Sequence, residues 1–306
     1  MDEASSISFQ GESYGLELDT YTSVWTDTWR RFRRSPSALI GLVIILILAV
    51  CATFAPQISG HTDPLAQNLA APTLPPSFHY LAGTDKLGRD IFTRLLFGAR
   101  LSVEIGVVSV GIALVVGTII GLISGYWGGK LDTALMGLMD VMLAFPTIIL
   151  AIAISAVLEQ RVSDVVKLFF AIGIVAIPIY ARIARSSVLA VKEQEFVEAA
   201  RAVGNGSFRL LFRHVLPNIM APLVVQATLG IGTAELDSAG LSYLGLGIQP
   251  PTPEWGSMLN DARDYWLNAP WALLFPGLAI SITVLGFNLL GDGLRDALDP
   301  KLKARS

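Results

Sequence analysis

The chain has 306 residues, of which 53% are hydrophobic and only 15% are charged, and its formal net charge is −3. Soluble domains usually carry about a quarter charged residues, so this composition indicates a membrane protein. The single cysteine, Cys51, excludes a disulfide framework and a cysteine-based metal site. No basic patch interleaved with aromatic residues is present, which argues against a nucleic-acid partner.

The start of the chain differs in character from the rest. Residues 1–23 are polar, acidic and without periodicity, and Trp25, Trp29 and Phe32 then recur at helical spacing among arginines. Such a pattern is typical of an amphipathic helix at the lipid headgroup level. We therefore expect residues 1–29 to form a cytoplasmic tail and the start of an interfacial elbow; the alternative is a plain start of the first membrane span.

Six apolar runs are long enough to cross a hydrocarbon core of about 30 Å. Their approximate bounds are residues 37–56, 101–124, 133–157, 165–184, 218–242 and 271–291. The fold class predicted is all-α, a polytopic membrane protein with one transmembrane domain over residues 30–306. In the second run, Gly117, Gly121 and Gly125 repeat every four residues, which predicts a face for close helix packing.

Charged residues inside the apolar runs are candidates for function, because an ionisable group in a membrane span needs a partner or water. Asp140 lies in the third run, and we expect Arg182 or Arg185 to neutralise it. Glu235 and Asp237 lie near the far end of the fifth run. Because residues two apart point to different helix faces, they do not form a paired acid/base site. They are either functional intramembrane groups or, as we favour, side chains at the outer interface in water.

A polar elbow, residues 185–217, separates the fourth and fifth runs. Good helix formers extend from Lys192 to Val203, and Gly204 can end a helix because glycine tolerates the left-handed conformation. Ser207 is expected to cap a second short helix, and Pro217 to begin the next apolar run. A polar helix–turn–helix between membrane spans cannot be buried in lipid, so it presents a shaped surface to water.

This elbow resembles the signature of ABC-importer permease subunits of the dipeptide/oligopeptide (peptide/nickel) family. The residues that carry the resemblance are Glu198, Ala199, Ala200, Gly204, His214, Leu216 and Pro217. In that family the segment is a coupling helix that docks into a groove on the ATPase subunit. The alternative, an ordinary cytoplasmic helix that caps two spans, leaves the full spacing unexplained.

A Gly/Pro-rich stretch after the fifth run, LSYLGLGIQPPTPEWGSM, resembles the corresponding loop of the dipeptide/oligopeptide subgroup, C-type permeases. The residues of this loop that carry the resemblance are Gly245, Gly247, Pro250, Pro251, Trp255 and Gly256. The sequence predicts a rigid loop at the outer mouth with Trp255 as an anchor. Two roles remain open for it: a surface for a substrate-binding protein, or packing of the outer vestibule.

The distribution of Lys and Arg predicts the orientation. With the first residue inside, fifteen of the 22 Lys and Arg residues fall on the inner side. Because positive residues are enriched in cytoplasmic loops, both termini and the elbow are expected on the cytoplasmic side of the membrane. The family resemblance implies that this is a prokaryotic plasma (inner) membrane.

Several kinds of catalytic chemistry are missing from the sequence. No GxxxxGK[ST] phosphate loop and no GxSxG motif occur, and the three histidines show no metal-ligand spacing. We therefore expect no enzyme activity, no metal site and no cofactor in this chain. The family resemblance implies that ATP and Mg²⁺ are held by partner subunits.

The resemblance implies the methionine-type permease fold and half of a translocation path for di- or oligopeptides. It also implies the partners: a homologous second permease in a heterodimer, two ATPase subunits, an extracytoplasmic substrate-binding protein, and membrane lipid. The same family also imports nickel, glutathione and other small solutes, and the sequence does not separate these cargoes. An ATP-independent secondary transporter is less favoured, because no inverted repeat is seen; a structural scaffold leaves the elbow unexplained.

Overall fold

A computed structural model of the chain describes residues 29–159 and 161–298, so the predicted tail of residues 1–28 lies outside the described residues. Over the described residues the secondary structure is helical, with one isolated β-bridge between Thr84 and Asp90. The elements in chain order are α2 (Pro36–Thr53), α3 (Ala55–Ile58), α4 (Ile91–Trp127), α5 (Gly129–Ala144), α6 (Thr147–Leu158), α7 (Asp164–Val191), α8 (Glu195–Ala202), α9 (Ser207–Arg209), the π-helical segment η1 (Leu210–Val215), α10 (Leu216–Tyr243), α11 (Trp255–Ala262) and α12 (Trp271–Leu298).

Five helices of the described chain are long and apolar enough to cross a membrane, and α5 with α6 forms a sixth if this bent pair is one span. The third predicted span is therefore present but broken, with a bend of 100° between its halves. The break falls at Phe145, which is extended, and Pro146, which has no backbone N–H to continue the helix.

The second span is much longer than predicted. Helix α4 begins at Ile91, ten residues before the expected start, because the carboxylate of Asp90 caps it. Asp90 accepts hydrogen bonds from the backbone N–H groups of Phe92 at 3.3 Å and of Thr93 at 3.1 Å. A side chain that satisfies the first free N–H groups of a helix stabilises this starting point by about 1 kcal/mol.

Helices α4 and α7 pack against each other along the predicted glycine face. A Cβ atom on Gly117 would lie 2.6 Å from Cβ of Tyr180, and one on Gly125 would lie 2.8 Å from Cβ of Val188. Gly121, between them, leaves no room for a Cβ atom beside Ala184. The prediction of a close-packing face is confirmed, and α7 is the helix that uses it.

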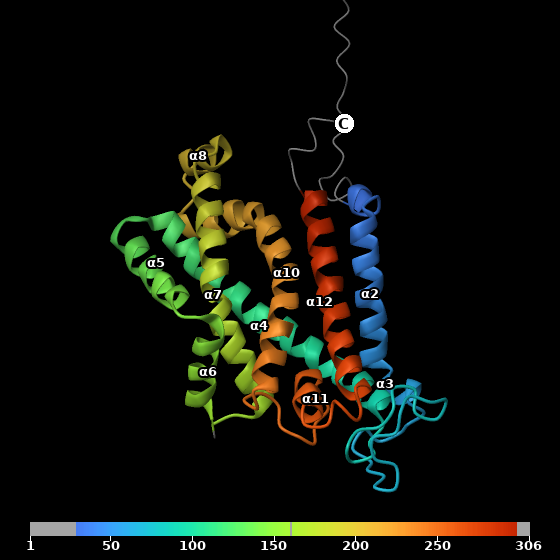
Figure 1. Cartoon of the computed structure of the whole chain (residues 1–306). Coiled ribbons are helices and arrows are strands. Elements are labelled where there is room, and N and C mark those ends of the chain that lie inside the picture. The colour runs from blue at the N-terminus through green and yellow to red at the C-terminus, as the bar shows by residue number, and fades with distance from the viewer. Residues whose placement is uncertain (1–28, 160, 299–306) are drawn as a thin grey trace, which may run out of the picture.

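The first and last helices, α2 and α12, lie side by side at one edge of the bundle (Figure 1). Their backbones also approach through glycine: a Cβ atom on Gly41 would lie 2.5 Å from the backbone nitrogen of Leu290. Each end of the described chain therefore supports the other.

The two ends of the bundle differ. The end that we name the elbow end carries α8, the start of α2 and the end of α12, and the opposite loop end carries α11 and the segment before α4 (Figure 1). At the loop end the buried Arg89 pairs with Asp85 at 2.5 Å and with Asp261 at 3.3 Å. The pair with Asp261 ties the segment before α4 to α11.

Candidate functional site

The elbow is built from α8 and the chain on either side of it. Helix α7 ends at Val191, and a three-residue turn precedes α8, so the predicted helix from Lys192 begins three residues later, at Glu195. Lys192 instead donates a hydrogen bond from Nζ to the backbone oxygen of Gly125, at 3.0 Å. Because this contact holds the end of α7 against the end of α4, the chain turns there and α8 projects beyond the bundle (Figure 1).

Helix α8 presents most of its surface to solvent. Val197 is its only buried residue, while Glu198, Ala199 and the following Val203 are exposed, Val203 to 84%. Gly204 ends the turn with φ +87°, the left-handed conformation predicted from the sequence, and no atom lies within 4 Å of its missing Cβ. An exposed apolar surface of this kind is typical of a docking site for another protein.

The second helix of the elbow differs from the prediction. Gly206, not Ser207, occupies the cap position, and no side chain caps the helix there. The helix then continues through η1 into α10, so Ser207–Tyr243 forms one 37-residue helical span. His214 lies within η1, and Leu216 begins α10 with Pro217 in its first turn, where the missing N–H of proline costs nothing.

Two ion pairs join α5 to α7 near the elbow. Arg182 donates from Nη2 to Oδ1 of Asp140 at 2.6 Å, so Arg182 is the partner of Asp140. Arg185 instead makes two hydrogen bonds to Asp132, both 2.6 Å long, and Ser124 on α4 also donates to Asp132. The Asp140–Arg182 pair is more than half exposed in this chain, whereas Asp132 is mostly covered.

The two carboxylates of α10 have different surroundings. Glu235 is only 1% exposed, so the expectation that it lies at the outer interface in water is wrong. It faces the interior of the bundle together with Ser238 and Ala239, which lie three and four residues further along the same face of α10 and are also buried. Asp237 is partly exposed and lines a cavity, so the two side chains do point to different faces.

The loop after α10 folds back onto the bundle. Trp255 is 1% exposed and donates from Nε1 to the backbone oxygen of Leu95 at 3.0 Å, which makes it the anchor expected from the sequence. A Cβ atom on Gly256 would lie 2.6 Å from Cα of Ala239, and Gly247 is pressed equally closely against Ser242. Arg94 donates to the backbone oxygen of Pro251 at 3.3 Å. These contacts are those of a packed loop.

Four further residues shape this loop. Gly245 turns the chain after α10 with φ +79°, and the Pro250–Pro251 bond is cis. Glu254 caps α11 by accepting from the N–H groups of Gly256 at 2.8 Å and Ser257 at 2.7 Å. Burial raises the pKa of the Glu254 carboxyl, and these two N–H donors oppose that rise.

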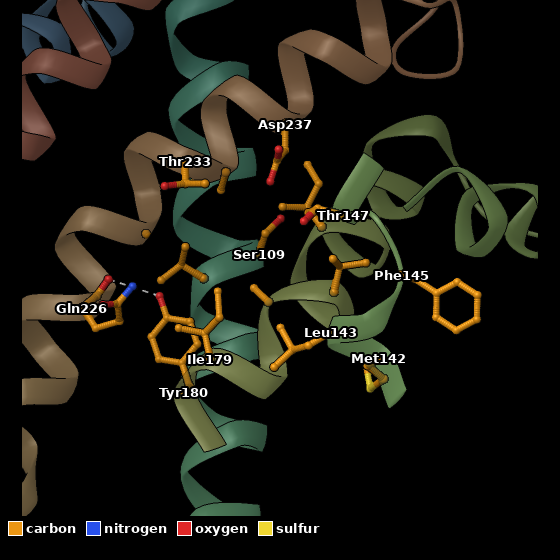
Figure 2. Close-up of a pocket in the computed structure, with 16 residues that line it drawn as sticks. Ser109, Met142, Leu143, Phe145, Thr147, Ile179, Tyr180, Gln226, Thr233 and Asp237 are labelled. Carbon is orange, nitrogen blue, oxygen red and sulfur yellow. Dashed lines mark hydrogen bonds between the residues drawn. The ribbon is translucent and has the colours of Figure 1, made fainter. Parts of the chain in front are cut away.

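A cavity of about 190 Å³ lies between α4, α7, α10 and the break between α5 and α6 (Figure 2). Its polar side chains are Ser109, Thr147, Tyr180, Gln226, Thr233 and Asp237, and its other walls are mostly aliphatic. Tyr180 donates to the backbone oxygen of Gln226 at 3.3 Å, and Gly230 leaves space for the tyrosine hydroxyl. The mixture of a few polar groups and apolar walls is typical of a small-molecule site.

Apart from Asp237, the sequence reasoning missed every residue of this cavity. A signal was present: Gln226, Gly230, Thr233 and Asp237 recur at intervals of four, three and four residues in an apolar run. That spacing places them on one face of a helix. Within the described residues, no three His, Cys, Asp or Glu side chains come together to hold a metal ion.

Comparisons with known proteins agree with this architecture. The family model described as "Binding-protein-dependent transport system inner membrane component" matches residues 117–304. The chain belongs to this family. A second model, the N-terminal transmembrane domain of oligopeptide transport permease C, matches residues 23–76 and identifies a permease of the C type. The chain is thus a multi-pass inner-membrane permease.

Curated relatives match nearly the whole permease. The dipeptide transport system permease protein DppC of Alkalihalophilus pseudofirmus is 47% identical over 94% of this chain and 93% of its own length. The di/tripeptide permease DppC of Pseudomonas aeruginosa is 47% identical over 92% and 94%. The glutathione permease GsiD of Escherichia coli O6:K15:H31 is 45% identical over 94% of both chains.

Solved structures support the fold. An inward-facing MetNI methionine ABC transporter aligns with a TM-score of 0.56 and 20% identity, covering 67% of this permease and 96% of that chain. An amino acid ABC transporter with histidines aligns with a TM-score of 0.52 and 14% identity, covering 67% and 94%. The predicted methionine-type permease fold is confirmed.

Proposed function

We propose that this permease forms one half of the translocation path of an ATP-driven importer of di- and oligopeptides. One geometric observation carries the proposal. Helix α8 joins α7 through a three-residue turn, and the turn of residues 203–206 joins it to the continuous helix Ser207–Tyr243 that contains α10; both α7 and α10 line the cavity. Any partner that moves α8 therefore moves two walls of the cavity together.

The partner at α8 is an ATPase subunit. The exposed face of α8 combines Glu198, which can accept a charge-assisted hydrogen bond, with the small Ala199, which lets a helix enter a groove. The exposed, stacked rings of Phe208 and Phe212, with centroids 6.3 Å apart, extend this surface. This arrangement supports coupling to the ATPase through residues 185–217.

The complete importer contains a second, homologous permease in a heterodimer, two ATPase subunits and an extracytoplasmic substrate-binding protein. ATP and Mg²⁺ bind to the ATPase subunits, and this chain holds no cofactor of its own. The elbow end and both termini face the cytoplasm, as the excess of Lys and Arg on that side favours.

Peptides are the favoured cargo, because relatives named for dipeptide and di/tripeptide transport are 47% identical to this chain. Glutathione is the second candidate, since the relative named for it is 45% identical. Uptake of a labelled dipeptide by vesicles that contain the complete complex, with glutathione as competitor, separates the two. Inhibition by excess unlabelled dipeptide but not by glutathione is the result expected.

Co-purification from detergent-solubilised membranes tests the coupling role. The permease carries a C-terminal tag, and the wild type is compared with a variant that combines Glu198→Lys and Gly204→Asp. The matched control is Asp264→Lys, which changes the charge of a 73% exposed side chain at the other end of the bundle. We expect an ATPase subunit to accompany the wild type and the control but not the elbow variant.

Two results would contradict the proposal. If the elbow variant brought down as much ATPase as the Asp264→Lys control does, α8 would not be part of the docking surface. A stable wild-type permease that brought down no ATPase would favour the ATP-independent carrier instead.

A further inference from the structure

Among the described residues that line the cavity, Asp237 is the only one with a charged side chain. Its carboxylate lies on the same side of the cavity as the hydroxyl groups of Ser109 and Thr147 (Figure 2). These three residues come from α10, α4 and the start of α6, so three separate helices place polar groups around one space. The other charged residue nearby in the sequence, Glu235, is buried on a different face of α10.

The carboxylate of Asp237 has no cationic partner within the described residues. Asp85, Asp90, Asp132, Asp140 and Glu254 are each paired or hydrogen-bonded, whereas Asp237 forms no ion pair or hydrogen bond with any described residue. A carboxylate that lines a mostly aliphatic cavity without a partner is costly, and a cationic ligand offsets that cost. The site is therefore suited to a positive group.

The position of Asp237 along the cavity matters as well. Gln226 and Asp237 lie eleven residues apart on α10, which is about 16 Å at 1.5 Å per residue. Asp237 is the member nearer the loop end, and Gln226 is the member nearer the elbow end. A cargo that enters from the loop end meets the carboxylate first and the amide afterwards.

Every peptide cargo carries one positive group that could bind at Asp237. A small peptide of any side-chain composition carries a terminal ammonium, which is protonated at neutral pH because its pKa is about 8. The cavity volume of about 190 Å³ is below the roughly 300–1,000 Å³ of pockets that enclose a whole drug-sized ligand. That space suits the amino end of a peptide and not the whole of a long one.

We propose that Asp237 binds the terminal ammonium of the peptide during passage, with the hydroxyls of Ser109 and Thr147 completing the site. The inference rests on the proposed function, because it assigns a recognition group to the same path. Recognition of the amino end explains how one cavity handles peptides whose side chains differ.

The test uses the complete importer in proteoliposomes, with its binding protein and ATPase subunits, and labelled Ala-Ala as cargo. Uptake is measured at pH 7 and pH 9 for the wild type and for Asp237→Asn, which keeps the size of the side chain and removes its charge. The rate ratio of wild type to variant cancels the effects of pH on the other subunits. We expect a ratio of about ten at pH 7 and about two at pH 9, where most of the ammonium has lost its proton.

The groups around Asp237 do not supply this pH dependence. Tyr180 from α7 is the other titratable side chain that lines the cavity, and α4, α5 and α6 contribute none to the lining. Glu235 faces away from the cavity and is present in every variant. Asp237→Glu, which retains a carboxylate, is expected to keep the pH-dependent ratio to Asp237→Asn.

The exposed Asp264→Asn is the control, with a ratio of one expected at both pH values. A ratio near one for Asp237→Asn at pH 7 overturns the inference. A large ratio that is equal at pH 7 and pH 9 also overturns it, because a structural role does not depend on the charge of the cargo. Wild-type vesicles without any ATP-dependent uptake of Ala-Ala overturn the proposed function itself, so the two failures are distinguishable.

Discussion

The contact between α4 and α7 should fail if a single methyl group is added at its centre. A Cβ atom on Gly121 would lie 2.5 Å from the backbone oxygen of Ala181 and 2.8 Å from the backbone nitrogen of Arg185. An ordinary contact begins at 3.4 Å, so α7 would have to retreat by roughly 0.9 Å. Backbone atoms cannot rotate out of the way as a flexible side chain can.

Gly111 in the same helix offers the matched control, since no atom lies within 4 Å of its missing Cβ. Gly121→Ala and Gly111→Ala each replace one glycine of α4 by alanine, so both variants have the same amino-acid composition and the same gain in helix propensity. Their difference therefore isolates the clash, which at a well-packed site costs about 1–3 kcal/mol. The Gly111 variant should be at least as stable as the wild type, because alanine favours helix over glycine by up to about 1 kcal/mol.

The assay is thermal unfolding of the purified permease in detergent. Samples are heated to a series of temperatures, and the fraction that remains folded is measured by size-exclusion chromatography. The midpoint for Gly121→Ala should lie below that for Gly111→Ala by roughly 2 °C or more for each kcal/mol. Equal midpoints would refute the reasoning, since they would mean that α4 and α7 separate without cost. A midpoint for Gly111→Ala below that for Gly121→Ala would also refute it.

Two further predictions concern single contacts. Arg182→Ala should lower coupled transport while changing the unfolding free energy by less than about 1 kcal/mol, because the Asp140–Arg182 pair is more than half exposed. Exchanging the two residues should restore transport, and a swap as defective as the single variant would contradict an ion-pair role. Trp255→Phe should cost about 1 kcal/mol, because it removes the 3.0 Å hydrogen bond from the indole N–H to the backbone oxygen of Leu95. An unchanged midpoint of thermal unfolding would show that this bond does not anchor the loop.

The membrane-spanning helices were predictable because the cost of placing polar backbone in lipid makes long apolar runs helical. The glycine face of α4 was predictable for a similar local reason, since residues four apart share a helix face. The turn at Gly204 was predictable from the freedom of glycine at positive φ, which is +87° here. Each of these depends on neighbours in the sequence.

The errors have equally specific causes. Helix α4 begins early because a capping residue, Asp90, outweighed the polar character of the stretch that follows. Ser207 is not a cap because the helix already begins at this residue, with Gly206 at the cap position, and no separate short helix forms because the π-helical segment links α9 directly to α10. Glu235 was placed in water because its burial depends on the packing of α10 in the bundle, which no local pattern records.

By itself, the sequence determined the membrane class, the all-helical fold, the number of apolar runs and, through the elbow motif, the family. Only the tertiary structure decided which arginine neutralises Asp140, that Trp255 is buried against α4, and that Asp237 lines a cavity while Glu235 does not. The physical reason is one of range. Hydropathy and turn geometry act within a few residues, whereas Asp140 and Arg182 are separated by 42 positions and meet only because α5 and α7 pack together.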